Sequence, residues 1–199
     1  MKDYNSFTDG ELIEHASNGD QLAFQYLVKR HNGWAYGFVL KTVRNPEAAW
    51  DITQEGFVRV FKNLSEFRQE SSFSTWFHRI LYNLCIDHWR RTGRRIEVEY
   101  QDVLSSGDTG PSGGRGHIFK TPEKALRHTE IVHLLEEALG ELSFEHRTIV
   151  VLREIDGLSY EEIAEVTGCP RGTVMSRLHH ARKNIVQHLK RHGYVSSEI

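Results

Sequence analysis

The chain has 199 residues, a formal net charge of −2 and 39% hydrophobic residues, a composition that suits packed helical domains better than one large core. No apolar run approaches the roughly 18 residues that a membrane helix needs, and the polar N-terminus lacks an export signal. We therefore expect a cytoplasmic protein with no membrane insertion. The cysteines Cys85 and Cys169 lie far apart and outside any CxxC motif, which excludes a disulfide framework and a zinc knuckle.

The first half of the chain predicts a series of amphipathic helices. Thr8 and Glu11 form a capping box for a short helix, and a longer helix is expected from Gln21 to about Val43. Asn45-Pro46 ends that helix and begins a third, because proline suits a first helical turn. The apolar stripe of this third helix comprises Ile52, Phe57, Val60, Phe61 and Leu64. Asp51, Gln54 and Glu55 lie off the stripe, where ordinary solvation would explain them.

The next predicted helix, for which Ser71, Ser72 and Ser74 offer caps, runs to about Arg91 and interleaves aromatic and basic side chains. Rings beside guanidinium groups suit unstacked bases, which need a surface to stack on and a cation for the phosphate. The alternative is a core helix with buried aromatics and snorkelling arginines, and composition alone does not decide between the two. We expect a core face of Phe73, Phe77, Ile80, Leu81, Leu84 and Cys85, beside a strip of Trp76, Arg79, Asn83 and Arg90.

The periodic pattern then stops. Residues 96–121 are rich in glycine and serine and predict a flexible linker. The fold class is therefore all-α, with two helical domains, 1–95 and 122–199, joined by that linker.

After Pro122 the helical pattern resumes, and the stretch LSYEEIAEVTGCPRGTVMSRLHHARK, residues 158–183, predicts a helix-turn-helix. Ser159 and Glu162 form a second capping box, and Gly168 followed by Pro170 makes the turn. The second helix has Val174, Leu178, Ala181 and Ile185 on one side, and we expect the chain to fray from Val186 onward.

The other side of that helix is polar and basic, and no aspartate or glutamate occurs between Val166 and Ser197. A helix that stays in solvent usually mixes charges of both signs. The pattern therefore favours a helix that lies in the major groove of DNA; two packed helices with a solvated surface are the alternative.

Twelve histidines raise the possibility of a helical nuclease or metal hydrolase, and His188 with His192 has the i, i+4 spacing of metal ligands. No third ligand with an adjacent general base is evident in the sequence. We therefore expect no catalytic residue, no metal site and no cofactor.

Three strings resemble one family in the expected order: DITQEGFVRVFKNLSEF, FSTWFHRILYNLCIDHWRR and LSFEHRTIVVLREIDGLSYEEIAEVTGCPRGTVMSRLHHARK. The first two are similar to region 2 of bacterial sigma factors and the third to region 4. With only these regions and a linker, the chain resembles an extracytoplasmic-function (ECF) sigma factor of RNA polymerase. The resemblance covers most of the chain outside the linker and tails.

The resemblance implies a non-enzymatic protein whose partners are core RNA polymerase, through its β′ clamp helices and β flap, promoter DNA and an anti-sigma factor. It implies polymerase docking by Asp51, Gln54, Glu55 and Phe57. It implies capture of the −10 strand by Arg68, Phe73, Trp76, Arg79, Asn83, Arg90 and Arg91, and contact with the −35 duplex by Arg171, Thr173, Ser176, Arg177, His180 and Lys183.

The recognition helix departs from the family pattern at Met175 and at His179-His180, which puts its sequence preference in doubt but not its docking in the groove. Cys169 stands at a position where the family usually has a capping side chain, so a weaker cap is expected. A LuxR-type regulator is an alternative source of such a helix-turn-helix. It would carry a sensor or receiver domain, and the first half has no alternation of strands and helices.

Overall fold

The computed structural model describes residues 3–67, 71–92 and 122–194, except for the side chains of 122–128. Within these ranges every regular element is helical, which confirms the all-α prediction. The first half contains α1 (Asp9–Ser17), α2 (Gln21–Val43), α3 (Pro46–Asn63), a short 3-10 turn (Leu64–Glu66) and α4 (Phe73–Thr92). The second half contains α5 (Pro122–Glu141), α6 (Phe144–Val150), a π-helical segment (Val151–Ile155), α7 (Tyr160–Thr167) and α8 (Arg171–Arg191).

Side-chain caps determine where several helices begin. The side chain of Thr8 accepts from the backbone N–H of Glu11 at 3.3 Å, and Glu11 accepts from the backbone N–H of Thr8 at 2.7 Å, which completes the predicted capping box. Asn45 caps α3 by accepting from the N–H of Ala48 at 2.8 Å, with Pro46 in the first turn. The predicted starts of α1 and α3 are therefore confirmed.

In the first half, α2 packs against both α1 and α3, and α4 closes the bundle against α2 and α3. Gly56 allows α3 and α4 to approach closely: a Cβ atom at this position would lie 2.6 Å from Leu81 Cδ2 and 3.2 Å from Phe77 Cε2. Both of these side chains are fully buried, so neither can move aside without disturbing the core.

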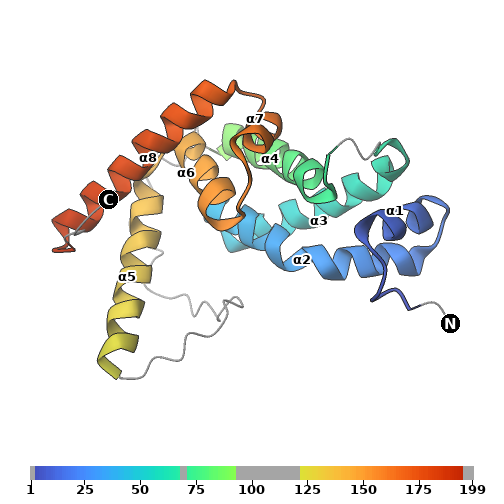
Figure 1. Ribbon diagram of the computed structural model, residues 1–199, viewed down its shortest axis with the longest axis horizontal. Helices are drawn as coiled ribbons and strands as arrows, with labels where there is room; N and C mark the ends of the chain where they lie inside the picture. The colour runs from blue at the N-terminus through green and yellow to red at the C-terminus, as the bar shows by residue number, and fades with distance from the viewer. Residues whose placement is uncertain (1–2, 68–70, 93–121, 195–199) are drawn as a thin grey trace.

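The two halves pack against each other, with α4 on α7 and α2 on α6 (Figure 1). Buried apolar side chains of both halves form one continuous core cluster. The ends of α5 and α8 farthest from α6 and α7 extend away from this core, at the end of the molecule opposite α1 (Figure 1). None of the helices in the described ranges is long and apolar enough to cross a membrane.

Three details differ from the sequence predictions. The chain does not fray from Val186, because α8 continues to Arg191 and packs on α5. Phe61 is 56% exposed and contacts Phe24 edge-on instead of joining the core stripe. The N-cap of α8 is Pro170, which makes no side-chain capping bond, and Cys169 lies one residue before it. The predicted linker 96–121 lies outside the described residues.

We predict opposite effects for two glycine-to-alanine substitutions. Gly56→Ala should lower the free energy of unfolding by about 1–3 kcal/mol, because the new methyl group overpacks the contact between α3 and α4. Gly33→Ala, in α2 with no atom within 4 Å of the added Cβ, should raise it by about 0.5–1 kcal/mol through helix propensity. Urea denaturation measures both values, and a stabilised Gly56→Ala variant would contradict the packing described here.

Candidate nucleic-acid and partner interfaces

The helix-turn-helix has the predicted geometry. The hydroxyl of Ser159 accepts from the N–H of Glu162 at 3.2 Å, and the Glu162 carboxylate accepts from the N–H of Ser159 at 2.8 Å. Gly168 adopts φ 66°, a left-handed conformation that ends α7 and that glycine tolerates without strain. Val174, Leu178 and Ala181 are buried, so the packing side of α8 is confirmed.

The opposite side of α8 is open to solvent. Arg171 forms an ion pair with Glu161 at 3.1 Å, but both side chains are more than 60% exposed, so the pair is weak and leaves the guanidinium available to another partner. Four of the six predicted duplex-binding residues are exposed and two are half-buried: in sequence order, Arg171, Ser176, His180 and Lys183 are exposed, and Thr173 and Arg177 are half-buried.

Helix α4 presents the predicted strip on one side. Asn83 and Arg79 are exposed and Trp76 is half-buried beside them, while Arg90 and Arg91 are exposed at the end of the helix. Their spacing brings them onto neighbouring turns of one helix. Arg68 lies outside the described residues.

Phe73 has a different position from the rest of the predicted strand-binding set. It is 4% exposed and lies in an aromatic cluster, with ring centroids 4.8 Å from His31, 5.7 Å from Phe77 and 6.0 Å from Trp76. A base could not stack on it without displacing these rings. In this structure Phe73 packs beneath Trp76, and Trp76 is the aromatic side chain of the predicted strand-binding set that reaches solvent.

The histidine in this cluster is held neutral. Trp34 donates its indole N–H to Nδ1 of His31 at 2.8 Å, so Nδ1 carries no proton, and Nε2 lies 2.9 Å from the carboxylate of Asp9. Burial lowers the pKa of His31 against the opposing effect of Asp9. The His31 ring is thus held by contacts at both nitrogens, and it packs against Phe73 at the N-terminus of α4.

The predicted polymerase-docking residues lie on α3. Asp51, Gln54 and Glu55 are exposed on one side of that helix, whereas Phe57 is 5% exposed and belongs to the core. Sequence periodicity had already put Phe57 on the apolar stripe, and the structure agrees with that assignment.

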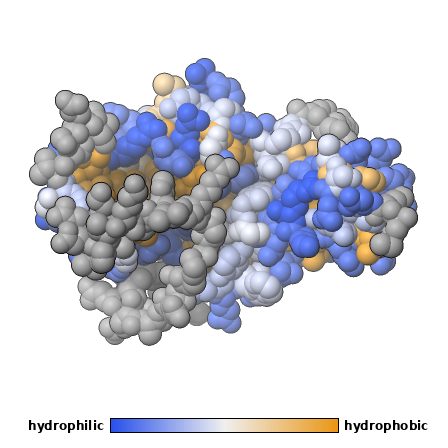
Figure 2. All heavy atoms as spheres, turned by 60° about the horizontal axis from the view of Figure 1, so that its bottom comes forward, coloured by the Kyte–Doolittle hydropathy of each residue, from blue (hydrophilic) through white to orange (hydrophobic). Residues whose placement is uncertain are grey.

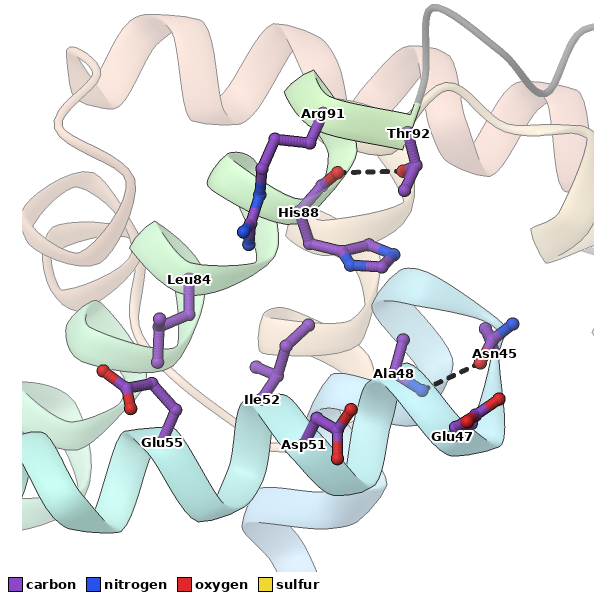
Figure 3. A pocket seen from close by; sticks show the side chains of 10 residues that line it. All are labelled: Asn45, Glu47, Ala48, Asp51, Ile52, Glu55, Leu84, His88, Arg91 and Thr92. Carbon is purple, nitrogen blue, oxygen red and sulfur yellow. Dashed lines mark hydrogen bonds between the residues drawn. The ribbon is translucent and has the colours of Figure 1, made fainter.

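A groove of about 560 Å³ separates the start of α3 from the end of α4 (Figure 3). Asp51 and Glu55 line its α3 side, and His88 and Arg91 line its α4 side. Burial, followed by the nearby charge of Arg91, lowers the pKa of His88, so the cation on this wall near neutral pH is Arg91. The carboxylates of Asp51 and Glu55 on one wall of the groove therefore face the guanidinium of Arg91 on the other.

Apolar side chains also reach the surface. Figure 2 shows hydrophobic residues gathered over the half of the molecule that α5 and α8 occupy in Figure 1. Val132 is 39% and Leu135 37% exposed on α5. The Cys85 thiol does not suit a reactive role, because burial raises its pKa. The half-buried Cys169 has its sulfur 3.0 Å from the hydroxyl of Thr167.

Polar contacts join the two halves, and sequence analysis did not identify them. Nε2 of His78 on α4 lies 3.0 Å from the Asp156 carboxylate, and Thr75 donates its hydroxyl to Glu162 on α7 at 3.1 Å. Arg147 of α6 donates to the backbone carbonyl of Thr42 on α2 at 3.0 Å. No spacing in the sequence could pair these residues, because their partners lie 78 or more positions apart.

Both ring nitrogens of His78 face oxygen atoms. Nδ1 of His78 lies 2.8 Å from the backbone carbonyl of Ser74, which can only accept, and Nε2 faces the carboxylate of Asp156. An N–H at Nε2 can donate to the Asp156 carboxylate, which joins the two halves directly. The side chains are 3% and 12% exposed, so this is a buried charge-assisted contact between the halves.

Comparisons with known proteins agree with both halves of the chain. The family model for Sigma-70 region 2 matches residues 27–95, and that for Sigma-70 region 4 matches residues 133–185. The RNA polymerase sigma-H factor of Pseudomonas aeruginosa is 35% identical over 184 residues, covering 89% of this chain and 91% of that protein. The ECF RNA polymerase sigma-E factor of Escherichia coli K12 is 35% identical over 178 residues, covering 89% and 92%.

Solved structures share the fold. The structure of CnrH in complex with the cytosolic domain of CnrY covers 92% of this chain and 97% of that chain, with a TM-score of 0.64 and 23% identity. The sigma factor RpoE in complex with the anti-sigma factor NepR from Bartonella quintana covers 84% and 96%, with the same TM-score of 0.64 and 23% identity.

The buried contact between the halves predicts a measurable loss of stability. Asp156→Ala leaves a buried imidazole N–H without its acceptor and should lower the free energy of unfolding by about 1–3 kcal/mol. Tryptophan fluorescence in urea can follow this loss, because the Trp34 ring stacks on His78 at 4.3 Å. Arg59→Ala is the control: it breaks an exposed i, i+4 pair with Glu55 and should cost less than about 0.5 kcal/mol. Equal losses in the two variants would contradict the buried contact.

Glu162 predicts a dependence of stability on pH. Hydrogen bonds from the backbone and side chain of Ser159 lower the pKa of Glu162 from its usual value of 4.5. A lowered pKa in the folded state adds stability above the unfolded-state pKa, and this contribution disappears as the pH falls. The difference in unfolding free energy between the wild-type chain and Glu162→Gln should therefore stay constant down to about pH 5.5 and shrink below pH 4.5.

Glu136→Gln removes an exposed carboxylate on α5 and controls for the change in net charge. A difference for Glu162→Gln that grew on acidification would be the opposite of the expected sign.

Proposed function

The chain belongs to the ECF group of RNA polymerase sigma factors, and we propose that it binds core RNA polymerase and divides promoter recognition between its two halves. The observation that carries this proposal is 35% identity to named sigma factors across 89% of the chain, with region 2 and region 4 in order. We assign the functional halves to residues 1–95 and 122–199, with 96–121 as the connecting segment.

The second half reads duplex DNA at the −35 element. The exposed side of α8 can enter a major groove, where arginine paired with guanine is the commonest specific contact. Arg171 and Arg177 are the residues we propose for base contact, and Lys183 and His180 for phosphate contact. Ser176 and Thr173 lie on the same side and complete the surface.

The first half captures the melted −10 strand. Unstacking a base costs a few kcal/mol, and stacking on an aromatic platform returns about 1–3 kcal/mol per base. Trp76 offers such a platform, Asn83 can hydrogen-bond a base edge, and Arg79, Arg90 and Arg91 can contact phosphates. We propose Phe73 as the support for Trp76, because it is buried beneath it.

Polymerase docking is assigned to the exposed carboxylates and amide of α3. Asp51, Gln54 and Glu55 can pair with basic side chains of the β′ clamp helices, since charge-assisted pairs to arginine are both strong and directional. We propose that the second half contacts the β flap. Phe57 acts from the core by holding α3 in place.

Promoter binding requires the two halves to separate. Elements two helical turns apart are about 70 Å apart along B-form DNA. In the packed form α4 contacts α7 and α7 contacts α8, so the two proposed DNA-binding surfaces lie on neighbouring elements. The segment 93–121 can reach up to about 95 Å when fully extended. We propose that the packed arrangement is the free form and that polymerase and promoter hold the halves apart.

The function needs neither catalysis nor a cofactor, because binding energy to the single strand drives opening of the duplex. We place the protein in the cytoplasm, where the polymerase acts. An anti-sigma factor is the proposed further partner. Two observations support this partner: membership of the family, and the exposed apolar side chains Val132 and Leu135 on α5.

Transcription from a cognate promoter with purified core polymerase distinguishes this proposal from its rivals. A sigma factor confers specific initiation on polymerase that lacks its own specificity subunit. A LuxR-type regulator or a nuclease would confer none. Failure of the chain to associate with core polymerase would rule the proposal out.

We predict that Asn83→Ala reduces open-complex formation by about tenfold, the equivalent of ~1.4 kcal/mol at one base contact. Permanganate footprinting measures opening, and an electrophoretic shift on closed duplex measures binding, which should change little. Asp87→Ala, at another exposed position of α4, is the matched control. Equal losses of opening and of duplex binding would remove Asn83 from the proposed base site.

A further inference from the structure

The C-terminal end of α8 contains a buried histidine whose ring nitrogens have no hydrogen bond. His188 is 5% exposed, and neither Nδ1 nor Nε2 has a hydrogen-bond partner in the described structure. The carboxylate of Glu141 lies 3.1 Å from Nδ1 but off the direction in which an N–H would donate. The carboxylate of Glu137 lies 3.7 Å from Nε2, which is too far for a hydrogen bond. Leaving a buried polar group unsatisfied costs stability, so another partner is expected.

A second imidazole lies one turn further along α8. The ring centroids of His188 and His192 are 4.7 Å apart, as their i, i+4 spacing requires. The sequence offered these two potential ligands but no third, and the fold brings in Glu137 from α5. One ligand atom from each of Glu137, His188 and His192 lies within 4.8 Å of the other two.

We propose that Glu137, His188 and His192 bind one divalent transition-metal ion of the Zn²⁺ class. Metal–ligand bonds of about 2.0–2.1 Å in a tetrahedral site put ligand atoms about 3.4 Å apart. The 3.7 Å between His188 and Glu137 is already close to that value. His192 is exposed and can rotate to close the remaining gap. Two imidazoles and a carboxylate suit Zn²⁺, Co²⁺, Ni²⁺ and Cu²⁺ better than Mg²⁺ or Ca²⁺.

The surrounding charges match those of a metal site. A metal-bound histidine usually donates its other ring N–H to a carboxylate. The Glu141 carboxylate lies 3.1 Å from Nδ1 of His188, and this exposed side chain can rotate into line with the N–H once Nε2 binds the ion. His133 lies 3.3 Å from the carboxylate oxygen of Glu137 that faces away from His188. Glu137 on α5 and His188 on α8 therefore each have a supporting partner, His133 and Glu141 respectively.

The ion would fasten α5 to the end of α8 that is remote from the turn. Figure 1 shows this end of α8 extending away from α7, where the helix begins. The duplex-binding residues proposed above end at Lys183, before the first ligand on α8. Metal binding should therefore stabilise the second half without covering its exposed basic side. The site depends on neither the proposed polymerase contacts nor the proposed DNA contacts.

The test uses the full-length chain without a histidine tag, titrated with Zn²⁺ against a chromophoric chelator. We expect one equivalent of Zn²⁺ to bind and to raise the Tm by about 5 °C at saturating metal. Co²⁺ should give the absorption bands of a four-coordinate site. His192→Ala and Glu137→Gln should each weaken binding at least tenfold and abolish the Tm shift. Glu141→Gln should weaken binding about tenfold through the loss of ligand support.

His179→Ala is the matched control, because His179 is exposed on α8 but is not part of the cluster. It should leave the Zn²⁺ affinity unchanged. Absence of stoichiometric binding to the wild-type chain would overturn the proposal. So would a loss of binding in His179→Ala together with its retention in His192→Ala, since the ion would then lie at the His179–His180 pair. His192 and Glu141 are exposed, so their substitution should leave the fold intact, and circular dichroism of each variant checks this.

Discussion

The contact between α4 and the second half is the constraint on which the rest of the structure depends. It buries a contact between Asp156 of the second half and His78, which lies on the same helix as the proposed strand-binding strip. Removing one member of this buried pair leaves the other without its partner, whereas separating the whole interface allows water to solvate both members at once. Such an interface can hold the halves together in the free chain and still be opened when larger binding surfaces compete for the two halves.

The packed form leaves some of the proposed binding surfaces open to solvent and holds another close to the contact between the halves. The exposed basic side of α8 and the carboxylates of α3 are both open to solvent, while the aromatic platform of α4 lies close to α7. Initial contact with polymerase or duplex DNA therefore requires no rearrangement. Spanning two promoter elements does, because the packed form holds the two proposed DNA-binding surfaces on neighbouring elements. This order of events gives polymerase binding a role in making the chain competent for promoter DNA.

Much of the fold could be predicted from local signals. The capping boxes at Thr8 and Ser159, the proline that opens α3 and the glycine that ends α7 all act within a few residues, so the sequence displays them directly. The packing of α4 on α7 and the alignment of Glu137 with His188 depend on tertiary contacts, and periodicity carries no information about them. The same limit explains the wrong prediction of a fraying tail after Val186: α8 remains helical because α5 packs against it. Phe73, in contrast, was assigned both to the core and to a DNA-binding role, and only its 4% exposure shows that the core position holds in this structure.

The central claim is that the two halves are packed together in the free protein and separate during promoter recognition. Its most direct test is the distance between spin labels at two exposed positions, Lys29 on α2 and Glu165 on α7, measured by pulsed electron paramagnetic resonance. The free chain should give one short distance, and the complex with core polymerase and promoter DNA should give a clearly longer one. The same distance in both states, or a broad distribution in the free chain, would contradict the account.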